Sequence, residues 1–507
     1  MFREAVLFRG LIVAAACGLA IFLGFQLTTP DEKSSLAWIV GIMLLLTLPL
    51  LIRWHHSLAI VCWNFSMIVF FLPGHPNIGL VVLGISLGIS IVNRTLRRGE
   101  MFIHNPATTY PLIFLALVIL ATAHMTGGIH GRAFGSDTWG ASRYIWMLGA
   151  IIGYFALIAQ PVPLQKANLM ASLFFLSGIT CVISDLIYLG GSGFGFLSLI
   201  FPQTSGAYLS TDSALERFDN TMRASQFVCW FMFMRYGIRG IFSWYRPWRL
   251  VLFVMVFAAG LLGGFRSFTV LTFLVFLIQF YLERLFRSSL LWILLAGMLL
   301  AGGFLGAFSD RLPLPVQRSV SFIPGIKINA AVRRDAQSTV DWRLEMWRTV
   351  LPLVPKYFWL GKGYTFDGTD FYLTSRKPWF SSYEAAMISD DYHNGILTLI
   401  IPLGIWGVLG FAAFCWGALR SLYANYRHGD PELKRVNTFL LAFFIGRLIF
   451  YVTLYGEFTL DLLVFTGIVG LSLTLNGGVK QKAVAIARPA TAELLRPPLA
   501  RRRLQPV

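Results

Sequence analysis

The chain has 507 residues, of which 56% are hydrophobic and only 13% are charged. A soluble domain does not need so much apolar surface, and apolar runs of roughly 20 residues, long enough to cross a bilayer, recur along the sequence. The formal net charge is +18, but the basic residues stand in short segments between apolar runs, as in cytoplasmic loops of membrane proteins. We therefore expect an all-α, polytopic integral membrane protein, and no nucleic-acid partner.

Apolar length and flanking charge predict about 12–14 transmembrane helices. The N-terminal stretch MFREAVLFRGLIVAAACGLA has the charged-then-apolar form of a signal peptide. Because many spans follow it, we interpret it as an uncleaved first helix. The five cysteines all fall in apolar runs, which indicates packing residues and no disulfide framework. The expected spans are 8–27, 36–52, 57–73, 77–93, 111–127, 143–160, 168–188, 224–240, 247–263, 267–283, 289–308, 393–418, 436–454 and 459–476.

The basic loops set the expected orientation. Alternation of the spans places the loops that begin at Arg94, Arg235, Arg284 and Arg420 on one side together with both termini. That side should be cytoplasmic. The basic tail contacts anionic lipid or simply balances charge. The expected organisation is an N-terminal transmembrane bundle (1–308), a periplasmic loop (309–392), C-terminal transmembrane helices (393–478) and a cytoplasmic tail (479–507).

The large outer loop contains a predicted amphipathic helix, STVDWRLEMWRTVLPLV. Trp342, Met346, Val350 and Leu353 form its apolar stripe, and Arg343 points elsewhere. Such a helix is expected to lie on the outer leaflet with its tryptophans at headgroup level. The later part of the loop is rich in aromatic side chains, which suit either a glycan platform or an interfacial belt: Tyr364, Phe366, Phe371, Tyr372, Trp379, Phe380, Tyr383 and Tyr392.

The stretch DDYHNGILTLIIPLGIWGVLG joins a polar cluster to an apolar helix. It opens with Asp390, Asp391, Tyr392, His393 and Asn394. On a helix that begins at His393, two glycines return to nearly the same face as the histidine, so a neighbouring helix could approach closely there. The alternative is an ordinary helix with a solvent-facing cap. The two packing glycines are Gly404 and Gly407.

Several basic residues are expected on the same outer face. Arg266 lies in GLLGGFRSFTV at the turn into a span, where a helix N-terminus favours an anion. Arg343 lies on the amphipathic helix, and Lys362 in the Gly-x-Gly turn of WLGKGYTF. Arg217 and Arg223 stand where the preceding outer loop returns to the membrane.

These motifs resemble those of the O-antigen ligase and polymerase family in their order along the chain. The matching residues are Arg266-Ser267, then Arg343 with Trp347 before Gly361/Gly363, then His393-Asn394 followed by Gly404 and Gly407. One departure is Gly264, where the family often has a serine. The resemblance covers residues 217 to 410. It implies a GT-C-like glycosyltransferase of the bacterial inner membrane, which uses a glycan linked to undecaprenyl pyrophosphate and acts at the periplasmic face.

The chemistry of such a donor fits these residue types. Arginines stay protonated and bind phosphate bidentately, so they can stabilise the charge that develops on a pyrophosphate leaving group without a metal. A histidine suits the removal of a proton from an acceptor hydroxyl. We therefore expect His393 to be the general base, with Asp391 orienting its ring and Asn394 beside it. Arg266 and Arg343 should hold the pyrophosphate, with Arg223 as a third cation. A metal bound by Asp390, Asp391 and His393 is the alternative.

Arg447 is the one arginine well inside an apolar span. Such a charge usually pairs or faces a polar cavity. Glu457 and Asp461 are the candidate partners for a structural ion pair, and a deep contact to the carrier's pyrophosphate is the alternative.

The expected activity is therefore inverting, metal-independent and cofactor-free transfer of an oligo- or polysaccharide to a glycan or lipid acceptor, within a membrane of ordinary lipids. Polymerisation of lipid-linked repeat units is the alternative in the same family. A lipid-linked glycan flippase is a more distant alternative. It predicts inverted repeats, broken helices in paired positions and several charges at the midplane, whereas this sequence shows no repeat, one clearly buried charge and a polar cluster on one side only.

Overall fold

The computed structural model describes parts of 17–24 and residues 33–70, 72, 75–96, 102–128, 140–202, 209–210, 213–214, 217–323, 325–366 and 390–481. Over these residues the protein is all-α apart from one pair of two-residue strands, β1 (Leu209–Ser210) and β2 (Ser213–Ala214). The helices are α2 (Lys33–Val61), α3 (Ile78–Leu96), α4 (Pro106–Met125), α5 (Ala141–Leu157), α6 (Leu164–Leu176), α7 (Val182–Gly190), α8 (Asp219–Ile241), α9 (Trp248–Leu261), α10 (Arg266–Leu282), α11 (Leu290–Phe308), α12 (Leu314–Ser319), α13 (Ala330–Val350), α14 (Leu353–Tyr357), α17 (Leu397–His428), α18 (Lys434–Thr453) and α19 (Phe458–Asn476). Short 3-10 turns join them: η1 (Cys62–Asn64), η3 (Ser177–Cys181), η4 (Gly191–Leu199), η5 (Leu285–Arg287), η6 (Ser309–Arg311) and η7 (Pro431–Leu433).

The predicted fold class is confirmed. Among the described residues, seven helical segments are long and apolar enough to cross a membrane, and α5, α9 and α10 are shorter apolar helices. The first expected span falls largely outside the described residues, as do the basic tail from 482 and the aromatic residues between 367 and 389. The seven segments are Ile78–Leu96, Pro106–Met125, Leu164–Gly190, Leu290–Arg311, Leu397–His428, Pro431–Thr453 and Phe458–Asn476.

The prediction of separate spans at 36–52 and 57–73 is wrong. A single helix, α2, runs to Val61, and the chain then leaves helical structure. Phe65 and Asn77 close this non-helical segment, because the Asn77 side chain donates to the Phe65 carbonyl at 2.8 Å and Ile68 forms a bridge with Asn77. The first expected span lies largely outside the described residues, so the position of the N-terminus on the cytoplasmic side stays a prediction.

Helix α8 is less apolar than the expected span at 224–240. It is not one of the seven segments, and it kinks at Gly237, whose φ is +67°. The Glu283 carboxylate accepts from the backbone N–H groups of Ile238 and Arg239 at 2.9 and 3.2 Å, which satisfies donors freed by the kink. α8 packs on α6, α9, α10 and α18, so other helices surround it.

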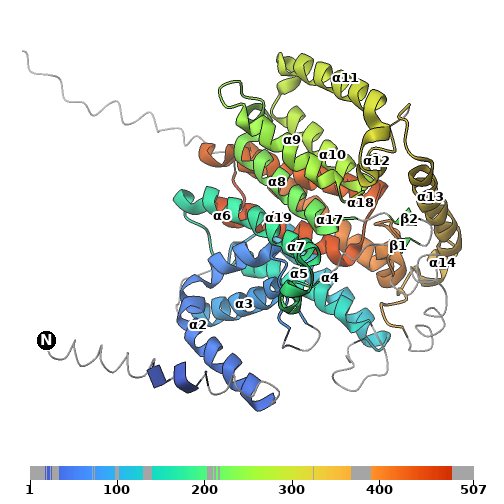
Figure 1. Ribbon diagram of the computed structural model, residues 1–507. Helices are drawn as coiled ribbons and strands as arrows, with labels where there is room; N and C mark the ends of the chain where they lie inside the picture. Colours follow the sequence, from blue (N-terminus) through green and yellow to red (C-terminus); the bar gives the residue numbers. More distant parts are fainter. Residues whose placement is uncertain are drawn as a thin grey trace, which may run out of the picture.

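The C-terminal helices form the centre of the protein. Figure 1 shows α17, α18 and α19 between the N-terminal helices α2–α5 and the middle helices α8–α10. α19 packs closely on α5 and α17 on α4, while α18 contacts α8 and α10. Three well-separated parts of the chain therefore meet along α17, whose N-terminal end carries the predicted histidine motif.

Helix α17 is broken at Pro402 and Gly404, where Gly404 has φ +67° and ψ −169°. The segment 358–363 fills the break. The N–H of Ile405 donates to the Phe358 carbonyl at 2.7 Å, and the Lys362 and Gly363 N–H groups donate to Ile401 and Pro402 at 2.8 and 3.0 Å. Backbone groups freed by a helix break must find partners inside a membrane protein. The Gly-x-Gly turn thus completes α17.

This break changes the predicted role of the two packing glycines. Gly404 is closely approached, but by the backbone of Trp359 to Gly361 and not by a helix. A Cβ at Gly407 would meet Leu403 of the same helix. The close helix contact lies further along α17, where a Cβ on Gly417 would fall 1.9 Å from the Ala107 carbonyl oxygen of α4. Close packing through glycine is present, at a different position from the predicted one.

Substitution of Gly361 by alanine should destabilise the fold. Gly361 has φ +73°, and an added Cβ would lie 2.2 Å from the Pro402 carbonyl oxygen at the break. Left-handed strain and the backbone clash together should cost about 2–4 kcal/mol, seen as a lower melting temperature in detergent. Gly297→Ala on α11 is the matched control, because nothing lies within 4 Å of its added Cβ. Equal melting temperatures for the two variants would contradict this explanation.

Candidate active site

The predicted helix start at His393 is wrong, because α17 begins at Leu397. Asp390 and His393 have φ values of +50° and +51°, a left-handed conformation that a helix does not contain. The Asn394 side-chain oxygen accepts from the N–H groups of Ile396 and Leu397 at 3.1 and 3.2 Å. Asn394 therefore caps α17, and His393 lies in a turn in front of the helix.

The contacts of the neutral His393 imidazole favour one tautomer. Its Nδ1 lies 3.0 Å from Oδ1 of Asp391 and 3.2 Å from the backbone carbonyl oxygen of the same residue. A carbonyl oxygen can only accept, so Nδ1 carries the proton and Nε2 of the neutral ring has the free lone pair. Asp391 is itself held, since Tyr455 donates its hydroxyl to Oδ2 at 3.4 Å. Asp391 thus contacts the ring of His393, and its orienting role stays a prediction.

Two aromatic rings enclose His393. Trp342 of α13 lies 5.3 Å from the imidazole between ring centroids, and Tyr455, between α18 and α19, lies 5.0 Å away on an edge-on approach. Edge-to-face pairs at these distances are favourable. The histidine is only partly exposed, at 25% of its side chain. These contacts hold the imidazole in one orientation.

Asp390 is tied into a buried network. Its carboxylate oxygens accept from Nη1 of Arg143 at 2.9 Å, from Nζ of Lys362 at 3.0 Å and from the hydroxyl of Tyr392 at 2.8 Å. Arg143 lies on α5 and Lys362 in the Gly-x-Gly turn. The network therefore fixes the His393 turn to two distant segments. With both oxygens engaged, this carboxylate is poorly placed to serve as the metal ligand of the alternative hypothesis.

Helix α13 confirms the predicted amphipathic helix, although it begins at Ala330, earlier than expected. Met346 and Val350 of the predicted stripe are fully buried against Tyr392, Leu397 and Ile401, with Trp342 and Trp347 packed beside them. Nε1 of Trp347 donates to the Tyr392 carbonyl at 2.8 Å. The apolar face thus packs on the His393 turn and the start of α17, where the sequence had indicated contact with lipid.

Arg343 follows Trp342 on α13 and is half-buried. Its Nε is buried without a hydrogen-bond partner among the described residues. Burial lowers the pKa of Arg343, while the neighbouring Tyr455 and Asp391 act in the opposite direction. Arginine stays charged even so. A buried guanidinium N–H without a partner is uncommon in folded proteins and is consistent with a site for an anion.

Arg266 is the first residue of α10. Its Nη2 donates to the Ala336 carbonyl of α13 at 3.3 Å, and the charges of Arg318 and Arg343 lie close enough to act on it. Arg266 and Arg343 therefore stand at one end of the bundle beside the His393 turn, on two different helices. The predicted convergence of these three residues agrees with the structure, and their roles in binding and catalysis stay predictions.

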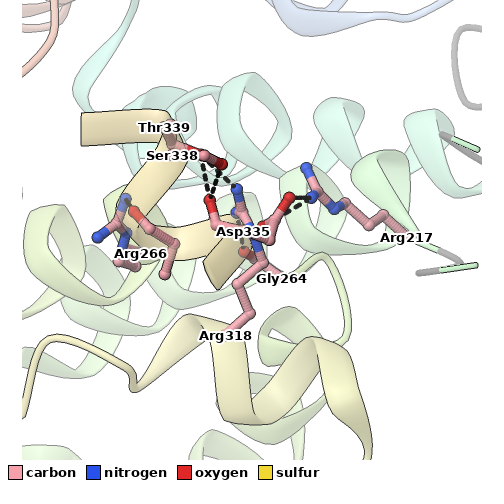
Figure 2. A network of polar contacts seen from close by, with 8 residues as sticks. Arg217, Gly264, Arg266, Arg318, Asp335, Ser338 and Thr339 are labelled. Carbon is pink, nitrogen blue, oxygen red and sulfur yellow. Dashed lines mark hydrogen bonds and ion pairs between the residues drawn. The ribbon is translucent and has the colours of Figure 1, made fainter. Parts of the chain in front are cut away.

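Asp335 joins Arg217 to Arg318 (Figure 2). Asp335 of α13 accepts from Nε of Arg318 and from Nη2 of Arg217 at 3.4 Å. The sequence did not single out Arg318 or Asp335. The sequence signal that could have pointed to Arg318 was its position between apolar residues in the loop segment PVQRSVSF.

Two further predicted arginines lie apart from this network. Arg223 is exposed on α8, near Asp219 and Cys181. Nε of Arg447 donates to the buried Asp461 at 2.7 Å, which is the structural ion pair expected as one alternative. Asp461 also accepts from the N–H of Glu457. A contact of Arg223 or Arg447 with pyrophosphate stays a prediction.

Glu457 supplies a pH-dependent prediction. Burial raises its pKa from 4.5 to about 7, and the nearby Asp391 adds to the increase. A carboxyl with a raised pKa in the folded state favours folding fully below pH 4.5, and this contribution is lost as the pH rises through about 7. Glu457→Gln should therefore be about as stable as the wild type near pH 4.5 and melt a few degrees higher at pH 8. A melting difference that is constant from pH 5 to 8 would contradict this assignment.

Comparison with known families bears on this arrangement. Residues 228–412 match the family model described as O-antigen ligase. This part of the chain is similar to the O-antigen ligase family. The matched region includes Arg266, Arg318, Arg343 and His393, whereas Arg217, Arg223 and Arg447 lie outside the match, which covers less than half of the chain. A search of curated proteins found no match to the chain.

The match confirms the resemblance to this family that the sequence motifs predicted. The apolar helices indicate a multi-pass membrane protein. The matched family consists of glycosyltransferase-like O-antigen ligases or polymerases that act on lipid-linked glycans.

Proposed function

We propose that the protein transfers an oligo- or polysaccharide from undecaprenyl pyrophosphate to an acceptor hydroxyl, as an O-antigen ligase. The observation that carries the proposal is that the imidazole of His393 and the partly buried guanidinium of Arg343 both lie beside Asp391 and Tyr455. A base and an anion-binding cation at one place are what displacement of a pyrophosphate requires.

The proposed reaction is one displacement. The acceptor oxygen attacks the anomeric carbon, and its proton passes to Nε2 of His393. The bond between the anomeric carbon and the phosphate oxygen breaks, and its electron pair leaves with the undecaprenyl pyrophosphate. Arg266 and Arg343 stabilise the charge that develops there, and Asp391 stabilises the imidazolium. A single displacement inverts the configuration at the anomeric carbon.

The proposed reaction uses arginines in place of a metal ion or other cofactor. The network of Asp390 with Arg143, Lys362 and Tyr392 supports this choice, because it engages the carboxylate that a metal would need. Transfer should therefore continue in the presence of a chelator. Loss of activity on chelation, with recovery when a divalent cation is returned, would favour the metal alternative.

The proposed site lies on the periplasmic side of the inner membrane. α10 and α17 both start at the site, and their far ends meet, because the Tyr426 hydroxyl donates to the Leu282 carbonyl at 3.0 Å. The basic loops at Arg284 and Arg427 stand at that far end, and Lys480 joins it through the Asn425 side chain. By the positive-inside rule the far end is cytoplasmic. The 17 residues of α10 extend about 25 Å, close to a bilayer core.

The test is a transfer assay with purified protein, lipid-linked glycan and candidate acceptors, with product size as the readout. A ligase adds one glycan to an acceptor, whereas a polymerase of the same family makes a ladder of repeat units without any other acceptor. No product with any acceptor, together with movement of lipid-linked glycan across vesicles, would instead indicate a flippase.

A further inference from the structure

Arg318 lies on the short helix α12 and is only 6% exposed. Each of its three guanidinium nitrogens donates to a different protein group (Figure 2). Nη1 donates to the Gly264 carbonyl at 2.7 Å, Nη2 to the Thr339 hydroxyl at 3.4 Å, and Nε to Asp335. A buried arginine with every nitrogen engaged is not presented to a substrate, so any effect on the reaction must pass through the groups that it holds.

The groups held by Arg318 belong to the two segments that carry the proposed pyrophosphate-binding arginines. Gly264 has φ +71° and stands two residues before Arg266 in the turn that begins α10. Asp335 and Thr339 precede Arg343 on α13 by eight and four residues. Residues at this spacing share one face of a helix. Arg318 therefore links the turn beside Arg266 to the α13 face that bears Arg343.

Other hydrogen bonds lie near this junction, among them the one from the Ser319 hydroxyl of α12 to the Leu261 carbonyl at 2.9 Å. Nη2 of Arg266 donates to the Ala336 carbonyl at 3.3 Å, and Arg217 reaches Asp335 at 3.4 Å. Loss of the Arg318 guanidinium would leave the Gly264 carbonyl without its 2.7 Å partner and Asp335 with one cation fewer. The turn and the helix would then be free to shift relative to each other. A displacement of about 1 Å in a reacting arrangement can cost on the order of a hundredfold in rate.

We propose that Arg318 is a positioning residue that fixes Arg266 and Arg343 at the spacing needed to hold the pyrophosphate, without touching the donor. This inference rests on the proposed glycan transfer. Asp335 acts with it as the carboxylate through which α13 is attached.

The test is a set of double-mutant cycles measured as kcat/KM for the lipid-linked donor. Arg318→Lys keeps the charge but cannot reach three partners, and should lower kcat/KM by about 10- to 100-fold in the wild type. The Arg266→Ala and Arg343→Ala backgrounds each lack one of the arginines to be positioned. In these backgrounds the fold-loss in kcat/KM caused by Arg318→Lys should be at least threefold smaller than in the wild type. Arg311→Lys, an exposed neighbour on η6, is the matched control and should change nothing.

A loss of equal size in all three backgrounds would overturn the inference, because it would mean that Arg318 binds the donor independently or only supports folding. If Arg318→Lys fails to fold, Asp335→Asn tests the same link from the other side with the same expected cycles. These outcomes are separate from failure of the proposed function, in which the wild type itself would form no glycan product.

Discussion

Replacement of His393 by alanine should reduce glycan transfer by about 10²- to 10⁴-fold, the range that a general base contributes. The acceptor hydroxyl has a pKa far above neutral, so without Nε2 its proton has no nearby base in the transition state. The loss should appear in kcat more than in KM for the donor, because the arginines that bind the pyrophosphate are unchanged.

His428→Ala is the matched control for this prediction. His428 ends α17 at the opposite end of the helix from the site and is exposed. It should keep full activity, and both variants should elute as folded protein in detergent. Transfer by the His393 variant within a few-fold of the wild type would show that His393 is not the base.

Replacement of Arg343 by alanine should reduce kcat/KM for the lipid-linked donor by about 10²- to 10³-fold, as removal of a preorganised charge stabiliser does. The partly buried guanidinium faces no other described partner at Nε, so the substitution removes a group that the fold does not otherwise use there. Arg343→Lys should recover only part of the activity, because an ammonium lacks the planar fork that binds phosphate bidentately.

Arg348→Ala is the control for Arg343. It lies on the same helix but is exposed. Its effect on transfer should be within about twofold of the wild type, since exposed charges contribute little. Similar losses for the two variants would mean that α13 contributes general positive charge and no specific contact.

The long apolar helices could be predicted well from the sequence. The expected spans at 247–263, 267–283, 289–308, 436–454 and 459–476 each agree within a few residues with α9, α10, α11, α18 and α19. The length of an apolar segment is enough to predict such a helix, because a segment that crosses lipid must form hydrogen bonds between its own backbone N–H and C=O groups. The ion pair of Arg447 with Asp461 was predictable for the same reason.

The sequence was less informative where the backbone leaves regular structure. The left-handed φ of His393 delays α17 by four residues, and an apolar pattern carries no sign of it. The expected span at 393–418 was continuous, and it included neither the break at Pro402 and Gly404 nor the Gly-x-Gly turn that fills it. Proline was also an unreliable sign of a helix end, because Pro49 lies inside α2 without interrupting the helix.

The candidate site was predictable in part. His393, Asp391, Arg266 and Arg343 have motif context, and the structure brings them to one end of the bundle. Arg318 and Asp335 belong to no motif. Their proposed role depends on contacts between α12, α13 and the turn before α10. Spacing along a chain does not reveal such tertiary contacts.

The most direct test of the central claim is an experimental structure of the protein with bound undecaprenyl pyrophosphate. The proposed mechanism predicts that the pyrophosphate lies within hydrogen-bonding distance of Arg266 and Arg343. It also predicts that the sugar-bearing end points toward Nε2 of His393. A pyrophosphate bound elsewhere, or one that places His393 on the far side from the scissile bond, would contradict it.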